Sequence, residues 1–284
     1  MISPWLIGFI CFTAGPMLAS AYLSLTKYDI FTPPQWTGFA NFARMLDDRL
    51  FWVALRNTAV YALMAVPIQV ISAMFFAVLL NQKVRGVGIF RTLFYLPSVM
   101  PDVANAALWM FLLNPQFGVV NMILTAVGLP PSKFLTDVHT VRPTMALLNL
   151  WYIGTMMVVF LAALQGVPEE LYEAAEIDGA TQITKFIHVT LPMISPSIFF
   201  NSIIGLIGAF QIFSFVYVAT YGGPANASLM YMLHIYRHAF ENLRMGYASA
   251  LAWVLFVIVL IFTLIQFRLA RRWVYYEGET GANS

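Results

Sequence analysis

The sequence has few charged residues and almost no cysteine. Only 10% of its 284 residues are Asp, Glu, Lys or Arg, and 60% are hydrophobic. Because soluble domains average about 25% charged residues, this composition excludes an ordinary water-soluble protein. The single cysteine, Cys11, excludes an intrachain disulfide framework and a cysteine metal cluster. The net charge is +2 and no basic run is present, so nucleic acid is not an expected partner.

Six apolar runs are long enough to cross a membrane. A spanning helix needs about 20 mostly apolar residues, and Asp102 is the only charged residue in the six runs. The first run has no basic flank and no cleavage-like site, so we expect a retained helix rather than a signal peptide, with Cys11 as a small apolar filler. The predicted spans are 4–25, 57–80, 93–113, 143–164, 197–219 and 248–267. The expected fold class is therefore all-α, a polytopic membrane protein with six transmembrane helices in a single domain over 1–284.

Basic residues close to the helix ends indicate the orientation. Lys83, Arg85 and Arg91 lie in one short loop, and three arginines follow the last span directly. Because basic residues gather on the cytoplasmic side of a membrane, we expect both termini and the segment 165–196 to be cytoplasmic.

The segment 165–196 departs from the apolar pattern. Five of the thirteen acidic residues fall within the ten residues that end at Asp178. Gly179 permits a backbone angle that ends a first helix, and Asp178 or Thr181 can cap a second one, which we expect to stop at Pro192. Amphipathic helices that lie on lipid are usually basic, so this acidic helix pair favours docking to a partner protein over the lipid surface.

The segment contains the pattern Glu173-Ala174-Ala175-x-x-Asp178-Gly179-Ala180, followed by Phe186 and then by Leu191-Pro192. This pattern resembles the EAA loop of ABC-importer permeases, a family with a coupling helix that sits in a groove of a cytoplasmic ATPase. Residues 272–277 resemble the end of the first permease in maltose-, lactose- and glycerol-phosphate-type importers. The resemblance implies that the anchor residues couple this chain to the ATPase. They are Glu173, Ala174, Ala175, Asp178, Gly179, Ala180, Phe186 and Pro192.

The resemblance also implies the function and the partners. The chain is expected to be the transmembrane subunit of an ATP-driven importer in a bacterial-type inner membrane, moving a carbohydrate by alternating access. Its expected partners are a second homologous permease, two ATPase subunits that use ATP and Mg, an extracytoplasmic solute-binding protein and membrane lipid. The chain has no Gly-Lys dipeptide and so no P-loop. We therefore expect no cofactor, no metal and no catalytic residue in this chain itself.

Three alternatives stay open at this stage. The first alternative is an importer permease with a polyol or glycerol phosphate as its solute. The second is a passive channel. Asp178-Gly179-Ala180 also resembles the start of a CDP-alcohol phosphotransferase site, but no second aspartate pair follows to hold a metal. His188 is expected to be a surface residue rather than a metal ligand.

Polar and aromatic residues inside the spans mark a candidate substrate pathway. Such residues are costly in lipid and often face a cavity, although packing between helices is the alternative for each. Pro97 and Pro101 are expected to kink the third span near Asp102, the only charged residue in the six predicted spans. Ala209 and Ile212 stand where maltose-type permeases place two amides, so the resemblance does not imply maltose. The candidates are Asp102, Asn105, Asn149, Tyr152, Thr155, Gln211 and Phe215.

Overall fold

The structure is a computed structural model that describes residues 2–82 and 86–275. Lys83 and Arg85 of the orientation argument, and Tyr276 and Glu277 of the C-terminal motif, lie outside the described residues.

Four runs of helix in the described part of the chain are long and apolar enough to cross a membrane. The first run comprises α1 (Ser3–Phe9), the π-helical turn η1 (Ile10–Ala14) and α2 (Gly15–Ser24). The others are α4 (Arg49–Leu80), α13 (Ser195–Phe210) with α14 (Ser214–Ala219), and α16 (Met245–Ala270). The all-α prediction is confirmed, and α4 and α16 extend beyond the predicted spans because polar residues in their end turns continue the helix.

A fifth span is bent. It consists of α8 (Val141–Leu148), the 3₁₀ turn η3 (Asn149–Tyr152) and α9 (Gly154–Gln165), and its two halves meet at an angle of 51°. The predicted span 143–164 is therefore present, but its middle is a bend rather than a straight helix.

The span predicted at 93–113 is not one helix. It is divided between α5 (Val87–Val99) and α6 (Asp102–Leu112), with Met100 extended between them at φ −71° and ψ 143°. Pro101 causes this break, because a proline ring disfavours helical geometry in the preceding residue. The expected kink is thus a full interruption. The count of six is accordingly not reproduced, since the described residues give four spanning runs, or five with the bent pair.

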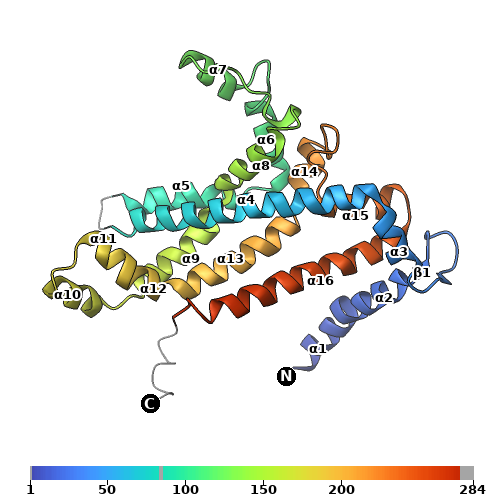
Figure 1. The fold of residues 1–284 in the computed structure, drawn as a ribbon, viewed down its shortest axis with the longest axis horizontal. Helices are drawn as coiled ribbons and strands as arrows, with labels where there is room; N and C mark the ends of the chain where they lie inside the picture. Colours follow the sequence, from blue (N-terminus) through green and yellow to red (C-terminus); the bar gives the residue numbers. More distant parts are fainter. Residues whose placement is uncertain (1, 83–85, 276–284) are drawn as a thin grey trace.

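Shorter elements occupy the two ends of the long helices (Figure 1). Near the start of α4 lie the paired strands β1 (Thr26–Lys27) and β2 (Gln35–Trp36), α3 (Ala40–Asp47), α15 (Tyr231–Tyr236) and the π turn η5 (Arg237–Glu241). At the other end lie α10 (Glu169–Ile177), α11 (Gln182–Lys185), the π turn η4 (Phe186–Thr190) and α12 (Leu191–Met193). The chain also forms α7 (Val119–Ala126) and the 3₁₀ turn η2 (Phe134–Thr136).

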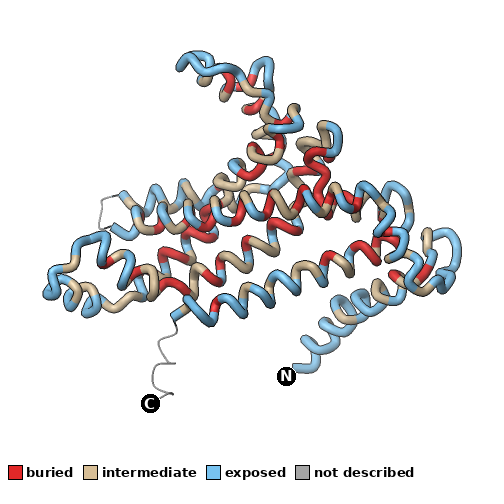
Figure 2. Tube along the Cα trace, in the orientation of Figure 1, coloured by how far each residue is buried: buried red, intermediate tan, exposed pale blue. Residues whose placement is uncertain are grey.

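Helix α4 forms the centre of the bundle and packs against α8, α9 and α13. Its fully buried positions include alanines such as Ala65, Ala73 and Ala77, whose small side chains let neighbouring helices approach closely. Gly154 allows a close approach of α9 to α5, because a Cβ there would lie 2.4 Å from the carbonyl oxygen of Phe94. The buried stripe on α4 and the exposed first span are both visible in Figure 2.

The first span has no buried residue in α1 or η1, and Phe12 is 85% exposed. Cys11 is likewise exposed, so it does not fill a gap within this chain as expected. The reason is that this span packs mainly through α2 on α16, which leaves its first half unpaired.

Candidate functional site

A cavity of about 700 Å³ opens between α4, α8, α9, α13 and α14. It contains six of the seven pathway candidates, which come from three separate spans. Those lining it are Asp102, Asn149, Tyr152, Thr155, Gln211 and Phe215.

Asn105, the seventh candidate, does not line the cavity. It is fully buried, donates from Nδ2 to the carbonyl oxygen of Pro97 at 3.3 Å and accepts from the Trp151 indole at 3.1 Å. These two bonds fasten both halves of the broken third span to η3. Asn105 therefore has a packing role in this structure, because it bonds to the Pro97 carbonyl oxygen at the point where Pro101 has no N–H to offer.

Three helix interruptions meet at this cavity. The α5–α6 break precedes Asp102, the turn η3 contains Asn149 and Tyr152, and residues 211–213 separate α13 from α14. Within a membrane, irregular backbone is tolerated only where it is buried in protein or lines a cavity. Transporters place discontinuous helices at their substrate sites for this reason. The breaks therefore explain why the polar candidates from distant spans converge.

Gln69 is a cavity residue that the sequence reasoning missed. Its Oε1 accepts a hydrogen bond from Asn149 Nδ2 at 3.2 Å, and its Nε2 lies 3.5 Å from the carbonyl oxygen of Tyr152. The available signal was a lone glutamine in the middle of the apolar span 57–80. Among the described residues that line the cavity, Asp102 is the only charged one.

A series of aromatic rings extends from the cavity toward the outside of the bundle. Phe213 lines the cavity and stacks on Tyr217 with ring centres 5.3 Å apart. Tyr217 in turn meets Tyr236 at 5.1 Å, and Tyr236 meets Phe240 at 5.2 Å. Phe240 is 62% exposed, so the series ends at the surface. Such flat apolar faces are suited to the C–H faces of a sugar ring.

The acidic segment forms the expected pair of helices at one end of the bundle. Gly179 ends α10 at φ +76°, and the N–H groups of Gly179 and Ala180 bond back to Glu176 and Ala175 at 3.0 and 2.9 Å. Only glycine adopts this left-handed angle without cost. Thr181, rather than Asp178, caps the second helix by accepting from the N–H of Thr184 at 3.3 Å. The predicted bend at Gly179 between the two helices is therefore confirmed. The segment 169–193, which contains α10, α11, η4 and α12, is called the elbow below.

The predicted stop at Pro192 is wrong. Helical backbone continues through η4 and α12 to Met193, and α13 begins at Ser195. The π-helical turn of η4 lies just before Pro192, where a regular turn would bring the proline ring against the carbonyl of His188. The wider turn thus accommodates the proline and joins the elbow to α13.

The elbow presents side chains to the outside. Glu173, Ala174 and Asp178 are exposed, as is Gly179, while the other coupling candidates are partly buried. Ile177 is 88% exposed. The half-buried group comprises Ala175, Ala180, Phe186 and Pro192.

A salt bridge joins the two helices of the elbow. Lys185 on α11 is buried and pairs with Glu176 of α10 at 3.3 Å. His188 is exposed and its Nδ1 lies 3.2 Å from the carbonyl oxygen of Thr184. The elbow is thus held by an ion pair between its helices and exposes the apolar side chain of Ile177.

Known proteins share both the sequence and this fold. The chain is 42% identical over 283 residues to the probable ABC transporter permease protein YesP of Bacillus subtilis (strain 168), covering 98% of this chain and 91% of that protein. It is 36% identical to the lactose transport system permease protein LacF of Rhizobium radiobacter, covering 95% and 92%. A chain of a bacterial alginate ABC transporter, solved with a periplasmic protein that carries an alginate pentasaccharide, matches with a TM-score of 0.84 and 26% identity, covering 96% and 93%.

These relatives are transport permeases, which excludes the phosphotransferase alternative. The family described as the binding-protein-dependent transport system inner membrane component matches residues 57–275, which include the cavity and the acidic elbow. The chain therefore belongs to the family of inner-membrane components of binding-protein-dependent transport systems.

Proposed function

We propose that this chain is the transmembrane subunit of an ATP-driven importer and that its substrate is a neutral carbohydrate delivered by an extracytoplasmic binding protein. The observation that carries the proposal is the cavity at the three helix breaks. It joins the side-chain amides of Gln69, Asn149 and Gln211 to the aromatic series that begins at Phe213. The hydroxyls of Tyr152 and Thr155 line the same cavity. Amides for hydroxyl groups and rings for apolar faces are the combination that a sugar requires.

The charge of the cavity favours a neutral solute. Asp102 contributes a carboxylate, and no basic side chain among the described residues lines this wall. An anion would meet repulsion that grows as water is displaced from the cavity. Among the relatives, two are named for lactose and for trehalose/maltose transport, and two are named for sn-glycerol-3-phosphate transport. The lone carboxylate favours a neutral sugar over glycerol phosphate or a uronate as the substrate.

The exposed elbow is the proposed contact with the ATPase. The eight coupling residues would transmit motion from two partner ATPase subunits that bind ATP and Mg, so hydrolysis would take place in those subunits and not in this chain. The acidic surface and the exposed Ile177 support a protein partner rather than lipid. A second homologous permease would complete the pathway.

Both termini are proposed to be cytoplasmic. The end of the chain beyond α16 lies beside the elbow, because the backbone N–H of Tyr275 donates to Ser195 Oγ at 2.9 Å. The described end of the chain at Tyr275 then lies on the membrane face of the ATPase contact. An even number of crossings returns a chain to the face from which it started. Six crossings, counting α5 and α6 as one broken span, would therefore place the start of the first span on the same face.

Reconstitution tests the substrate class. The chain is purified with its permease and ATPase partners in proteoliposomes, and ATPase stimulation and uptake are measured with binding proteins loaded with neutral oligosaccharides, polyols, glycerol phosphate or uronates. We expect uptake of a neutral oligosaccharide and no uptake of the anions. Asp102→Asn removes the charge without changing the shape, and we expect it to reduce discrimination against anions. Uptake of anions alone by the unaltered protein would refute the neutral-substrate proposal.

A further inference from the structure

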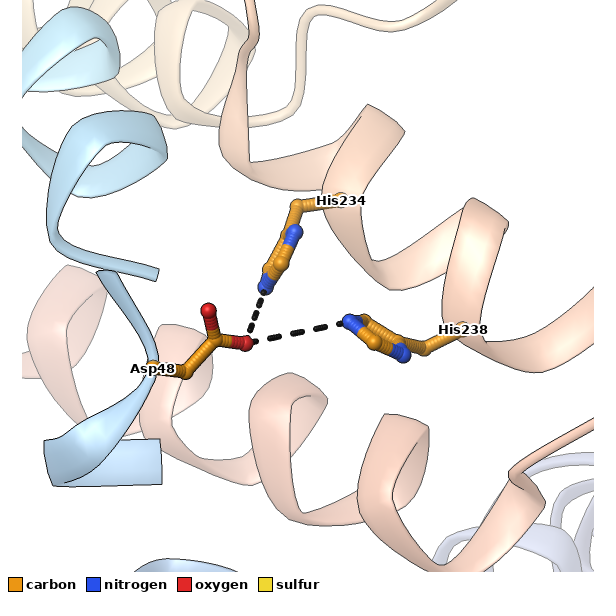
Figure 3. A group of neighbouring side chains, drawn as sticks. All are labelled: Asp48, His234 and His238. Carbon is orange, nitrogen blue, oxygen red and sulfur yellow. Dashed lines mark ion pairs between the residues drawn. The ribbon is translucent and has the colours of Figure 1, made fainter. Parts of the chain in front are cut away.

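Three potential metal ligands lie together at the end of the bundle opposite the elbow. Asp48 directly precedes α4, His234 lies on α15, and His238 lies one turn further on η5 (Figure 3). Asp48 Oδ2 is 3.4 Å from His234 Nε2 and 3.9 Å from His238 Nε2. One ligand atom from each of the three residues lies within 4.8 Å of the other two.

The carboxylate of Asp48 is divided between two tasks. Its Oδ1 accepts from the N–H of Leu50 at 2.8 Å and so caps α4. Its Oδ2 is turned toward the two imidazoles and accepts from the Tyr247 hydroxyl at 2.9 Å. The cap fixes the carboxylate, so Oδ2 is held in place before any ligand arrives.

His234 places a buried ring nitrogen at this site. Its side chain is only 2% exposed, and Nε2 lies 3.4 Å from Asp48 Oδ2 but makes no hydrogen bond with any of the described residues. Buried polar atoms in native proteins nearly always have a partner. Burial lowers the pKa of His234, and burial together with the neighbouring His234 lowers the pKa of His238 to about 4.

The two distances from Asp48 approach those of a tetrahedral metal centre, and the ligand atoms of the two imidazoles lie within 4.8 Å of each other. Ligand atoms at 2.0–2.1 Å from a tetrahedral zinc ion lie about 3.3 Å apart. The 3.4 Å between Asp48 and His234 already has this value, and the 3.9 Å between Asp48 and His238 requires a shift of about half an ångström. Arg44 and Arg244 are nearby positive charges, but both are exposed and therefore screened by solvent.

We propose that Asp48, His234 and His238 form a divalent-metal site and that zinc is the ion it takes. A set of two imidazoles and one carboxylate favours zinc, because magnesium and calcium bind mainly to oxygen ligands. Water would complete the coordination. The bound ion would connect the start of α4 to the segment 231–241, which carries the outer part of the aromatic series. This inference does not depend on the identity of the transported solute.

Metal titration of the whole importer tests the site. The purified complex is stripped with a chelator, zinc is added back, and bound metal and thermal unfolding are measured. We expect one zinc per copy of this chain and, at zinc well above Kd, a rise in Tm on the order of 5 °C. Cobalt in place of zinc should give the intense visible absorption of a tetrahedral site.

The variants separate this site from others. His238→Gln should weaken zinc binding at least tenfold and abolish the cobalt spectrum, whereas His188→Gln, an exposed histidine at the opposite end, should change neither. Asp48→Asn keeps an oxygen to cap α4 and should also weaken binding. If Asp48→Asn does not fold, His238→Gln and the cobalt spectrum decide the matter. Unchanged zinc affinity in His238→Gln, or no zinc binding by the stripped complex, would overturn the proposal in favour of a metal-free Asp–His contact.

Discussion

Replacement of Gly179 by valine should uncouple the elbow from the ATPase. Gly179 has φ +76° at the end of α10, and a Cβ built there meets no atom within 4 Å. A side chain would therefore not collide with the bundle. Its whole cost would come from the left-handed backbone angle, which determines the direction in which α11 leaves α10.

The cost can be worked out from this angle. A residue other than glycine pays about 1–2 kcal/mol in the left-handed region, and a β-branched side chain such as valine is at the upper end of that range. A cost of about 2 kcal/mol shifts the population of the elbow about 30-fold away from its native angle. The spans stay intact because no core contact changes. Asn is the matched control, since it tolerates this angle and also adds a side chain of similar size.

The assay is uptake and ATPase stimulation by the reconstituted complex, with membrane insertion measured in parallel. We expect Gly179→Val to insert normally but to lose most of its uptake, while Gly179→Asn keeps most of it. Normal uptake by the valine variant would refute the coupling role of the elbow. Equal loss of uptake in both variants would show instead that the docking surface has no room for any side chain at position 179. The backbone angle would then not be the cause.

Three other variants probe the packing, the docking surface and the aromatic series. Gly154→Ala should prevent the helix bundle from assembling, because the added Cβ would lie 2.4 Å from the Phe94 carbonyl oxygen. In the control Gly208→Ala the added Cβ meets no described atom within 4 Å, so this variant should keep the wild-type Tm in detergent. Ile177→Lys should leave Tm unchanged, since this side chain is 88% exposed, but should weaken binding of the ATPase about tenfold in a pull-down. Tyr217→Ala should raise the uptake KM for an oligosaccharide about fivefold through loss of stacking, while Tyr217→Phe should not; equal values for Ala and Phe would remove the aromatic series from the pathway.

Local signals in the sequence were enough to predict the elbow. Gly179 and Thr181 act on their own neighbours, so their effects can be worked out without knowing the fold. The error at Pro192 came from the same local reasoning. A proline usually ends a helix, but a π turn that only the folded chain reveals allows helical backbone to continue through it.

The cavity could be predicted only in part. Polar and aromatic side chains in apolar spans identified six lining residues, because the cost of placing a polar group in lipid is a property of each residue alone. Asn105 obeys the same rule, yet its side chain bonds across the α5–α6 break instead of lining the cavity. Gln69 was missed although the same local rule applies to it; its contact with Asn149 on another span appears only in the fold. Asp48 and His234 are likewise distant in sequence, so no local pattern connects them.

Two uninterrupted helices connect the elbow to the cavity. α9 has 12 residues and α13 has 16, which makes them about 18 and 24 Å long. α9 begins beside the cavity residue Thr155 and leads into α10, while α13 follows α12 and ends beside Gln211. Asn201 contacts the Met156 carbonyl oxygen at 3.5 Å and links the two helices. Regular helices move as rigid rods, whereas the breaks at 149–153 and 211–213 can change angle. A displacement of the elbow would therefore reach the cavity undiminished, and the chain would bend at the residues proposed to hold the sugar.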